Sequence, residues 1–122
     1  MQISTIGQIS INAHDVDRAT TFYRDVLKLK HLFSFSRLSF FDCSGVRLML
    51  SIPATPELDH PSSIIYFKVA DIRAAYDELL GQGVHFEAAP NMVARMKDHE
   101  LWLAEFRDSE GNVMSLMSEV PL

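Results

Sequence analysis

Apolar and polar residues alternate along the start of the chain, and the period then lengthens. In Ile3–Ala13 an apolar set, Ile6, Ile9 and Ile11, alternates with a polar set, Gln8, Ser10 and Asn12, which predicts a strand with one buried face. Val16–Leu27 has apolar residues three and four apart, the period of a helix, and Asp15 stands at its N-cap position. Three more strands are expected at His31–Phe35, Leu38–Cys43 and Val46–Ile52. The first module, residues 3–52, is therefore predicted to be βαβββ.

The same order of elements returns after a short interruption. Residues 53–62 contain three prolines and no periodicity, so they are expected to connect two modules. A strand is expected at Ser63–Val69, then a helix capped by Asp71 that ends near Gly81 and Gly83. The remaining strands are predicted at Val84–Ala88, Leu101–Phe106 and Val113–Met117, with a loop over 90–98. Residues 63–118 thus form a second βαβββ module of a single α+β domain, 1–122.

Two local signals indicate that the second module is a copy of the first. A tight turn containing Gly111 separates two β-favouring segments, and Gly45 occupies the matching place in the first module. Aligning these hairpins pairs Met49 with Ser115. The two N-cap aspartates lie 56 residues apart, which pairs Gln8 with Ile64. An internal duplication is therefore predicted.

Composition narrows the range of partners. The 122 residues are 48% hydrophobic and 22% charged, which is sufficient for one packed core. The net charge of -5, with scattered Lys and Arg, argues against a nucleic-acid or anionic-membrane surface. The single Cys43 cannot form an internal disulfide, and no apolar run or signal peptide indicates a membrane or export. A cytoplasmic location is expected, with a small molecule or a second copy of the chain as partner.

A family resemblance rests on these motifs. Ile11–Ala19 and the apolar residues after it resemble the opening of the vicinal oxygen chelate superfamily, which includes glyoxalase I, extradiol dioxygenases and bleomycin-resistance proteins. Val69–Asp71 resembles the opening of its second module, and Arg107–Asn112 its Asp-Pro-Asp-Gly-Asn turn, with Ser109 replacing proline. The resemblance covers nearly the whole chain. It implies two βαβββ modules whose curved mixed sheet forms a ligand-binding cup, commonly completed in a homodimer, but it implies no single reaction.

The resemblance also implies where a divalent metal would bind. The family takes one ligand, commonly His or Glu, from the first and last strand of each module. These positions carry over to Gln8, Met49, Ile64 and Ser115. Hard cations prefer carboxylate, imidazole or water oxygen, whereas these residues offer an amide, a thioether, an alkyl group and a hydroxyl. We therefore predict no metal and no other cofactor.

A ligand-binding face follows from the period of two. If Gln8 faces the cup, the same side includes Ser51 and Val113 and the residues predicted to bind ligand, to which Trp102 is added as an apolar wall. The predicted ligand-binding residues are Gln8, Ser10, Asn12, Arg47, Met49, Ile64, Tyr66, Lys68, Trp102, Ser115 and Met117. For Trp102, packing in the core or at a dimer contact is as plausible as a place in the ligand-binding wall. The mixed lining is typical of a small-molecule pocket, and Arg47 or Lys68 could pair with a carboxylate or phosphate.

Two functional classes follow. The first, which we favour, is a metal-free binding protein that holds an amphipathic small molecule. The second is an enzyme, a lyase, isomerase or dioxygenase relative with nonstandard metal ligands or with metal-independent acid–base chemistry. His99 and Glu105 are its weak catalytic candidates, although a surface role is favoured for both. A homodimer is also predicted, because a monomer would expose the phenylalanine-rich strands of residues 32–41.

Overall fold

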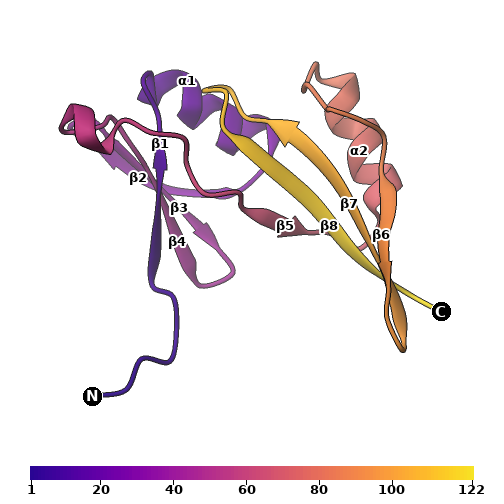
Figure 1. Ribbon diagram of the computed structural model, residues 1–122. Coiled ribbons are helices and arrows are strands. Elements are labelled where there is room, and N and C mark those ends of the chain that lie inside the picture. Colours follow the sequence, from indigo (N-terminus) through magenta and orange to yellow (C-terminus); the bar gives the residue numbers. More distant parts are fainter. The chain divides into compact units, whose positions relative to one another are not determined.

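A computed structural model describes residues 1–122 as two compact units, residues 1–62 and 63–122. Each unit holds a four-stranded mixed sheet and one main α-helix, and Figure 1 labels these elements. This arrangement confirms the predicted α+β class and the two βαβββ-like modules. None of the helices combines the length and the apolar composition that spanning a membrane requires.

The sheet of the first unit has its first and last strands paired in parallel. The order is β1 (Gln8–Asn12), β4 (Val46–Ser51), β3 (Leu38–Cys43) and β2 (Lys30–Phe35), with the other pairs antiparallel. β1 is shorter than predicted because only five residues find partners on β4. Ile3 and Ile6, which precede β1, are 86% and 64% exposed. The predicted strand therefore loses Ile3 and Ile6, because neither residue pairs with another strand.

The helix of the first unit changes type before it ends. α1 (Val16–Thr21) continues as a π-helix over Phe22–Val26, a difference that apolar spacing does not distinguish. Its predicted cap is confirmed, since the Asp15 carboxylate accepts a hydrogen bond from the Arg18 N–H at 3.0 Å. The connector contains only a short 3-10 helix, Pro56–Leu58. Fully buried side chains form the core between helix and sheet: Ile11, Ala19, Tyr23, Phe41, Leu48 and Leu50.

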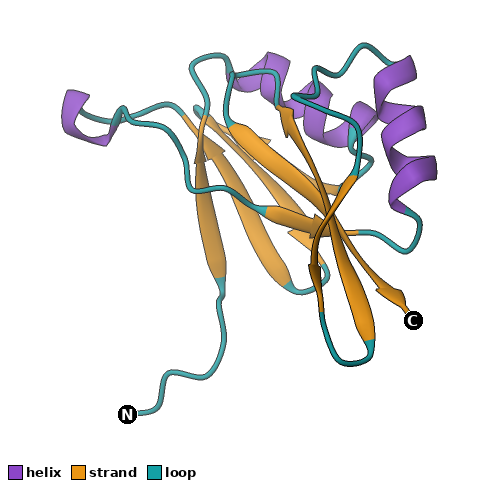
Figure 2. Cartoon of the chain, turned by 45° about the vertical axis from the view of Figure 1, so that its right-hand side comes forward, coloured by secondary structure: helices purple, strands orange, loops and turns teal.

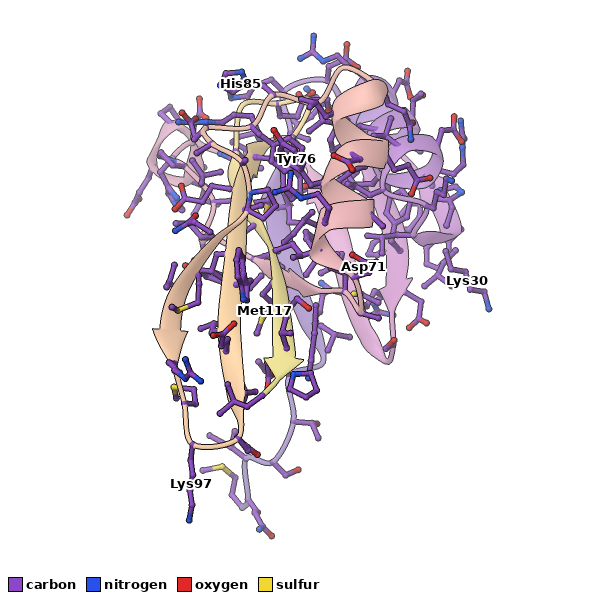
Figure 3. All side chains as sticks on the ribbon, turned by 90° about the vertical axis from the view of Figure 1, so that its right-hand side faces the viewer. Lys30, Asp71, Tyr76, His85, Lys97 and Met117 are labelled. Atoms are coloured by element: carbon purple, nitrogen blue, oxygen red, sulfur yellow. The ribbon has the colours of Figure 1, made fainter.

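The sheet of the second unit repeats this topology. The order is β5 (Tyr66–Lys68), β8 (Val113–Pro121), β7 (His99–Arg107) and β6 (Asn91–Arg95), with β5 and β8 parallel. α2 (Ile72–Gly81) is the long purple helix at the right of Figure 2, and it contacts β7 and β8. Figure 3 labels Asp71 at the start of α2, where its carboxylate accepts from the Ala74 N–H at 3.0 Å. The core of this unit includes Ile72, Leu79, Phe106, Met114 and Leu116.

The strands of the second unit differ from the predicted ones in two places. Within the predicted strand Val84–Ala88, Phe86 forms only an isolated bridge to Phe106. The strand β6 instead lies in the predicted loop 90–98, directly after Pro90, which has no N–H to donate. β6 is an almost fully exposed edge strand, so its sequence shows no alternation. The predicted strand Ser63–Val69 shortens to β5, and Ile64 lies before it.

The repeated hairpin is confirmed. Gly45 and Gly111 have positive φ angles of 96° and 83°, a conformation that glycine adopts without a Cβ clash. In the second copy, the Asp108 carboxylate accepts from the Glu110 N–H at 2.9 Å and the Asn112 N–H at 2.8 Å. The turn therefore positions the end of β7 and the start of β8 through local bonds.

Candidate functional site

The first unit presents one sheet face away from its buried core, called here the open face. Gln8, Ser10 and Asn12 alternate with half-buried Ile9 and fully buried Ile11. They stand beside Arg47, Met49 and Ser51 in the parallel β1–β4 register. Side chains also touch across the two strands. The Gln8 amide donates to the Met49 sulfur at 3.7 Å, and the Ser10 and Ser51 hydroxyls are 3.2 Å apart.

Arg47 is the central cation of the open face. Its Nε donates to Gln8 Oε1 at 2.7 Å, and its Cζ lies 5.6 Å from the centre of the Phe40 ring. Asp42 is the cross-strand partner of Arg47, but the Asp42 carboxylate accepts from the Gly45 N–H at 3.1 Å instead. Arg47 thus has an orienting hydrogen bond and an aromatic neighbour but no ion pair.

Three phenylalanines form an aromatic group beside Arg47. The Phe33 and Phe40 centroids are 4.7 Å apart, and Phe35 stacks near both rings at 5.9 and 5.8 Å. Phe40 is nearly buried, whereas Phe33 and Phe35 are 46% and 56% exposed. The predicted ligand-binding residues did not include Phe33 and Phe35. The phenylalanine-rich run was visible, but the register of β2 against β3 was not.

The polar residues at the other end of β1 are held by the connector. The Asn12 side chain donates to the His60 carbonyl at 2.7 Å and approaches Asp59 at 3.4 Å, while its backbone N–H donates to Ser62 Oγ at 2.8 Å. His14 Nε2 lies 2.8 Å from the same Asp59 carboxylate. Asn12 therefore fastens the connector to the sheet.

A cavity of about 470 Å³ adjoins the aromatic group at the end of β2 and β3. Phe35, Leu38 and Ile52 give it an apolar part, and Asp17 and Arg37 give it both signs of charge. Its volume suits a small molecule. Asp15 also lines the cavity, so two carboxylates stand against the single guanidinium of Arg37 and the formal charge of the lining does not favour an anion.

In the second unit, the predicted ligand residues of β5 and β8 are side by side. Tyr66 pairs with Ser115, and Lys68 pairs with Met117. Ser115 is fully buried, and its hydroxyl donates to the Leu116 carbonyl at 2.8 Å. Lys68 Nζ lies 3.1 Å from the Glu119 carboxylate. The Ser115 hydroxyl and the Lys68 ammonium group, two of the predicted ligand-binding groups, thus already have partners within the unit.

Trp102 lies on the opposite face from the one predicted. The β7–β8 register pairs Glu105 with Ser115 and Trp102 with Ser118. Since successive residues of a strand alternate, Trp102 shares the face of buried Phe106 rather than that of Ser115. Its indole Nε1 donates to Glu100 at 3.2 Å. The correction arises because the sequence contained no signal for the register of this strand.

The two catalytic candidates lie at opposite ends of β7. His99 Nδ1 is 2.7 Å from Asp98, and its Nε2 is 3.4 Å from Glu119. The hydrogen bond with His99 lowers the pKa of Asp98. Glu105 is exposed and lies six residues further along the strand, a separation of roughly 20 Å at about 3.3 Å per residue. One small reacting group would not contact both side chains.

The four positions implied for a metal do not suit a hard divalent cation. Both functional atoms of the Gln8 amide are engaged, and one of them contacts the positively charged Arg47 guanidinium. Met49 supplies only a thioether sulfur, and the Ser115 hydroxyl donates to backbone oxygen. Ile64 has no donor atom. Nowhere in the chain do three or more His, Cys, Asp or Glu side chains gather in a metal-binding arrangement.

Comparisons with known proteins agree with this architecture. The profile of the Glyoxalase/Bleomycin resistance protein/Dioxygenase superfamily matches residues 5–116. No curated protein matches the sequence. Solved structures with the same fold include a member of that superfamily from Sphaerobacter thermophilus, with a TM-score of 0.82, 23% identity and coverage of 96% of this chain and 98% of that one.

Two further structures show how widely the fold is used. A lactoylglutathione lyase from Agrobacterium tumefaciens has a TM-score of 0.76 and 21% identity, with coverage of 96% of this chain and 95% of that one. A virulence protein from Salmonella typhimurium has a TM-score of 0.80 and 18% identity, with coverage of 98% and 100%. At these identities the likeness concerns the fold, whereas the profile match spans most of the sequence. The chain belongs to the glyoxalase/bleomycin resistance protein/dioxygenase superfamily.

Proposed function

We propose that this protein binds a small amphipathic molecule without a metal ion, using the open face of its first unit. The observation that carries the proposal is the 2.7 Å hydrogen bond from Arg47 Nε to Gln8 Oε1. Gln8 stands at a position implied for a metal ligand, and its side-chain oxygen accepts a hydrogen bond from the positively charged Arg47 guanidinium. A second cation brought to this oxygen would be repelled by the guanidinium.

The remainder of the face supports binding of an organic ligand. Met49 and the exposed rings of Phe33 and Phe35 supply apolar surface, while Ser10, Ser51 and Arg47 supply polar atoms. A largely apolar surface with a few oriented polar groups is the usual composition of a small-molecule site. The strands of the sheet hold these polar atoms in place.

Metal analysis combined with ligand screening tests the proposal. Protein purified without chelator and dialysed should contain far less than one equivalent of Zn, Ni, Fe or Mn. The same metal-free protein should be stabilised thermally by an amphipathic aromatic ligand, by about 2.7 kcal/mol when the ligand is at 100 times its Kd. Stoichiometric metal that survives dialysis would contradict the proposal.

The second candidate function is metal-independent acid–base catalysis on the second unit. Glu105 favours it, because this carboxylate is exposed on the face of Ser115 and makes no hydrogen bond or ion pair through its side chain. The lyase among the structural neighbours supplies a reaction to assay. We expect no lactoylglutathione formation above background, with or without added Zn or Ni. Turnover that disappears in Glu105→Gln would favour the enzyme.

We also propose that the protein is a homodimer. β1 and β2 are the edges of the first sheet, so each has one row of backbone groups without a partner strand, and Leu32 of β2 is 41% exposed. Exposed apolar edge strands favour pairing with another chain. The cytoplasmic location stays a prediction from the sequence.

A further inference from the structure

We propose that the ligand is a planar aromatic molecule with one anionic group, such as an aromatic carboxylate. This inference rests on the proposed function and narrows it to a chemical class. Two features of the open face carry it, and both come from the same three neighbouring strands. One recognises a flat ring and the other recognises a negative charge.

The aromatic group recognises the ring. Phe33 and Phe35 are stacked with an interplanar angle of 16°, and Phe35 is inclined to Phe40 by the same angle. The rings of Phe33 and Phe35 are half exposed, so surface remains for another ring to contact. Aromatic pairs in offset or edge contact gain free energy beyond simple area burial. A saturated ligand of equal size would make the area contact without this additional gain.

Arg47 recognises the charge. Gln8 accepts from its Nε, which fixes the guanidinium plane and leaves the two terminal NH2 groups without an ion-pair partner. A carboxylate fits two parallel guanidinium N–H donors. Asp42, the carboxylate across the ladder, is held by its own turn at Gly45. The charge of Arg47 is therefore available to a ligand.

The two features are adjacent. Arg47 Cζ is 5.6 Å from the Phe40 ring, and that ring is 4.7 Å from Phe33. A benzoate or naphthoate can place its carboxylate on Arg47 while its ring contacts Phe33. The neighbouring cavity does not supply the same pair of features, because Arg37 shares its lining with Asp17.

Isothermal titration calorimetry with three probes tests the inference on the metal-free 122-residue chain. The probes are 2-naphthoate, its neutral analogue 2-naphthamide, and the saturated anion decahydronaphthalene-2-carboxylate, which has the same carbon skeleton. We expect 2-naphthoate to bind at least about tenfold more tightly than the amide, the range of a charge-assisted hydrogen bond. Equal or stronger binding of either other probe would overturn the inference.

Variants locate the site. Arg47→Gln should weaken 2-naphthoate at least about tenfold, and Arg47→Lys should retain part of the affinity because it keeps the charge but not the planar fork. Phe33→Leu should weaken it roughly two- to twelvefold. Arg37→Gln is the matched control, with the same charge loss in the cavity, and should leave the affinity unchanged. If Arg37→Gln weakens binding and both Arg47 variants do not, the ligand occupies the cavity and the inference is wrong.

The failure of this inference is distinguishable from failure of the proposed function. Metal that survives dialysis would contradict the metal-free proposal whatever the probes show. A different result separates the two proposals: the metal-free protein is stabilised by a neutral aromatic compound but does not prefer 2-naphthoate. This result would support the proposed function and contradict the inference that the ligand is an aromatic anion. Circular dichroism of each variant confirms that a lost affinity reflects the site and not unfolding.

Discussion

Single residues set the chemistry of the open face. Gln8 has one oxygen and one nitrogen to offer, and Arg47 and Met49 engage both. This arrangement converts a position implied for metal binding into a support for a cationic side chain. Single residues also determine the two hairpin turns, where a positive φ angle favours glycine at Gly45 and Gly111.

The first prediction concerns Gly111, whose φ of +83° lies in the left-handed region. Gly111→Ala should lower the free energy of unfolding by about 1–2 kcal/mol, because a Cβ is strained in that conformation although no atom blocks it. Gly7→Ala is the matched control, since Gly7 has open space and no positive φ. Urea denaturation measures both. Equal effects of the two substitutions would show that the backbone angle is not the cause.

The second prediction concerns Asp98, whose pKa is lowered chiefly by its hydrogen bond with His99. His99→Ala should raise the pKa of Asp98 toward the ordinary range, as followed by NMR titration of the carboxyl carbon. A lowered carboxyl pKa adds stability above the unfolded-state pKa, and that contribution disappears as pH falls through the folded-state pKa. His85→Ala, near Glu87 instead, should leave Asp98 unchanged. An Asp98 pKa that is unchanged in His99→Ala would rule out this cause.

At the scale of elements, the two helix starts repeat each other closely. Asp15 has φ and ψ of -126° and 97°, Asp71 has -128° and 98°, and each carboxylate accepts from the N–H three residues later. Local sequence is sufficient for such a cap. Local sequence is not sufficient for every strand. β6 has almost no buried face, and it forms only because it pairs with β7.

The third prediction tests a cap. Asp71→Ala should lower the free energy of unfolding by about 1 kcal/mol, because the Ala74 N–H loses its acceptor. Asp71→Asn should retain most of the stability, since asparagine also caps helices. The control Asp77→Ala lies on the exposed part of α2 and should be neutral or slightly stabilising. A loss for Asp77→Ala as large as that for Asp71→Ala would contradict the cap as the cause.

At the scale of the whole molecule, each sheet ends in strands that pair with another strand along one side only. β1 and β2 are edges in the first unit, and β5 and β6 are edges in the second. The exposed side chains of β2 make one of these edges apolar. Such edges in natural proteins are covered, charged or paired with another chain.

The fourth prediction is that light scattering at micromolar concentration gives twice the chain mass of 13.8 kDa. Dilution should shift the mass toward the monomer if the interface is of ordinary strength. A strictly monomeric mass across the whole concentration range would remove the dimer. This measurement is independent of the ligand, so it does not decide the proposed function.

Elements governed by neighbouring residues were determined by the sequence alone. The two caps, the glycine turns and the alternation that separates Gln8 from Ile11 follow from backbone sterics and from the periods of helix and strand. The resemblance of these motifs also indicated the superfamily, which the profile match confirmed.

Only the tertiary structure decided which strands pair and in what register. A shift of one residue reverses the face of every side chain in a strand, so the place of Trp102 depended on the β7–β8 ladder. The bond between Gln8 and Arg47 joins residues 39 positions apart. No local pattern encodes such a contact, because it exists only when two separate strands lie in parallel register.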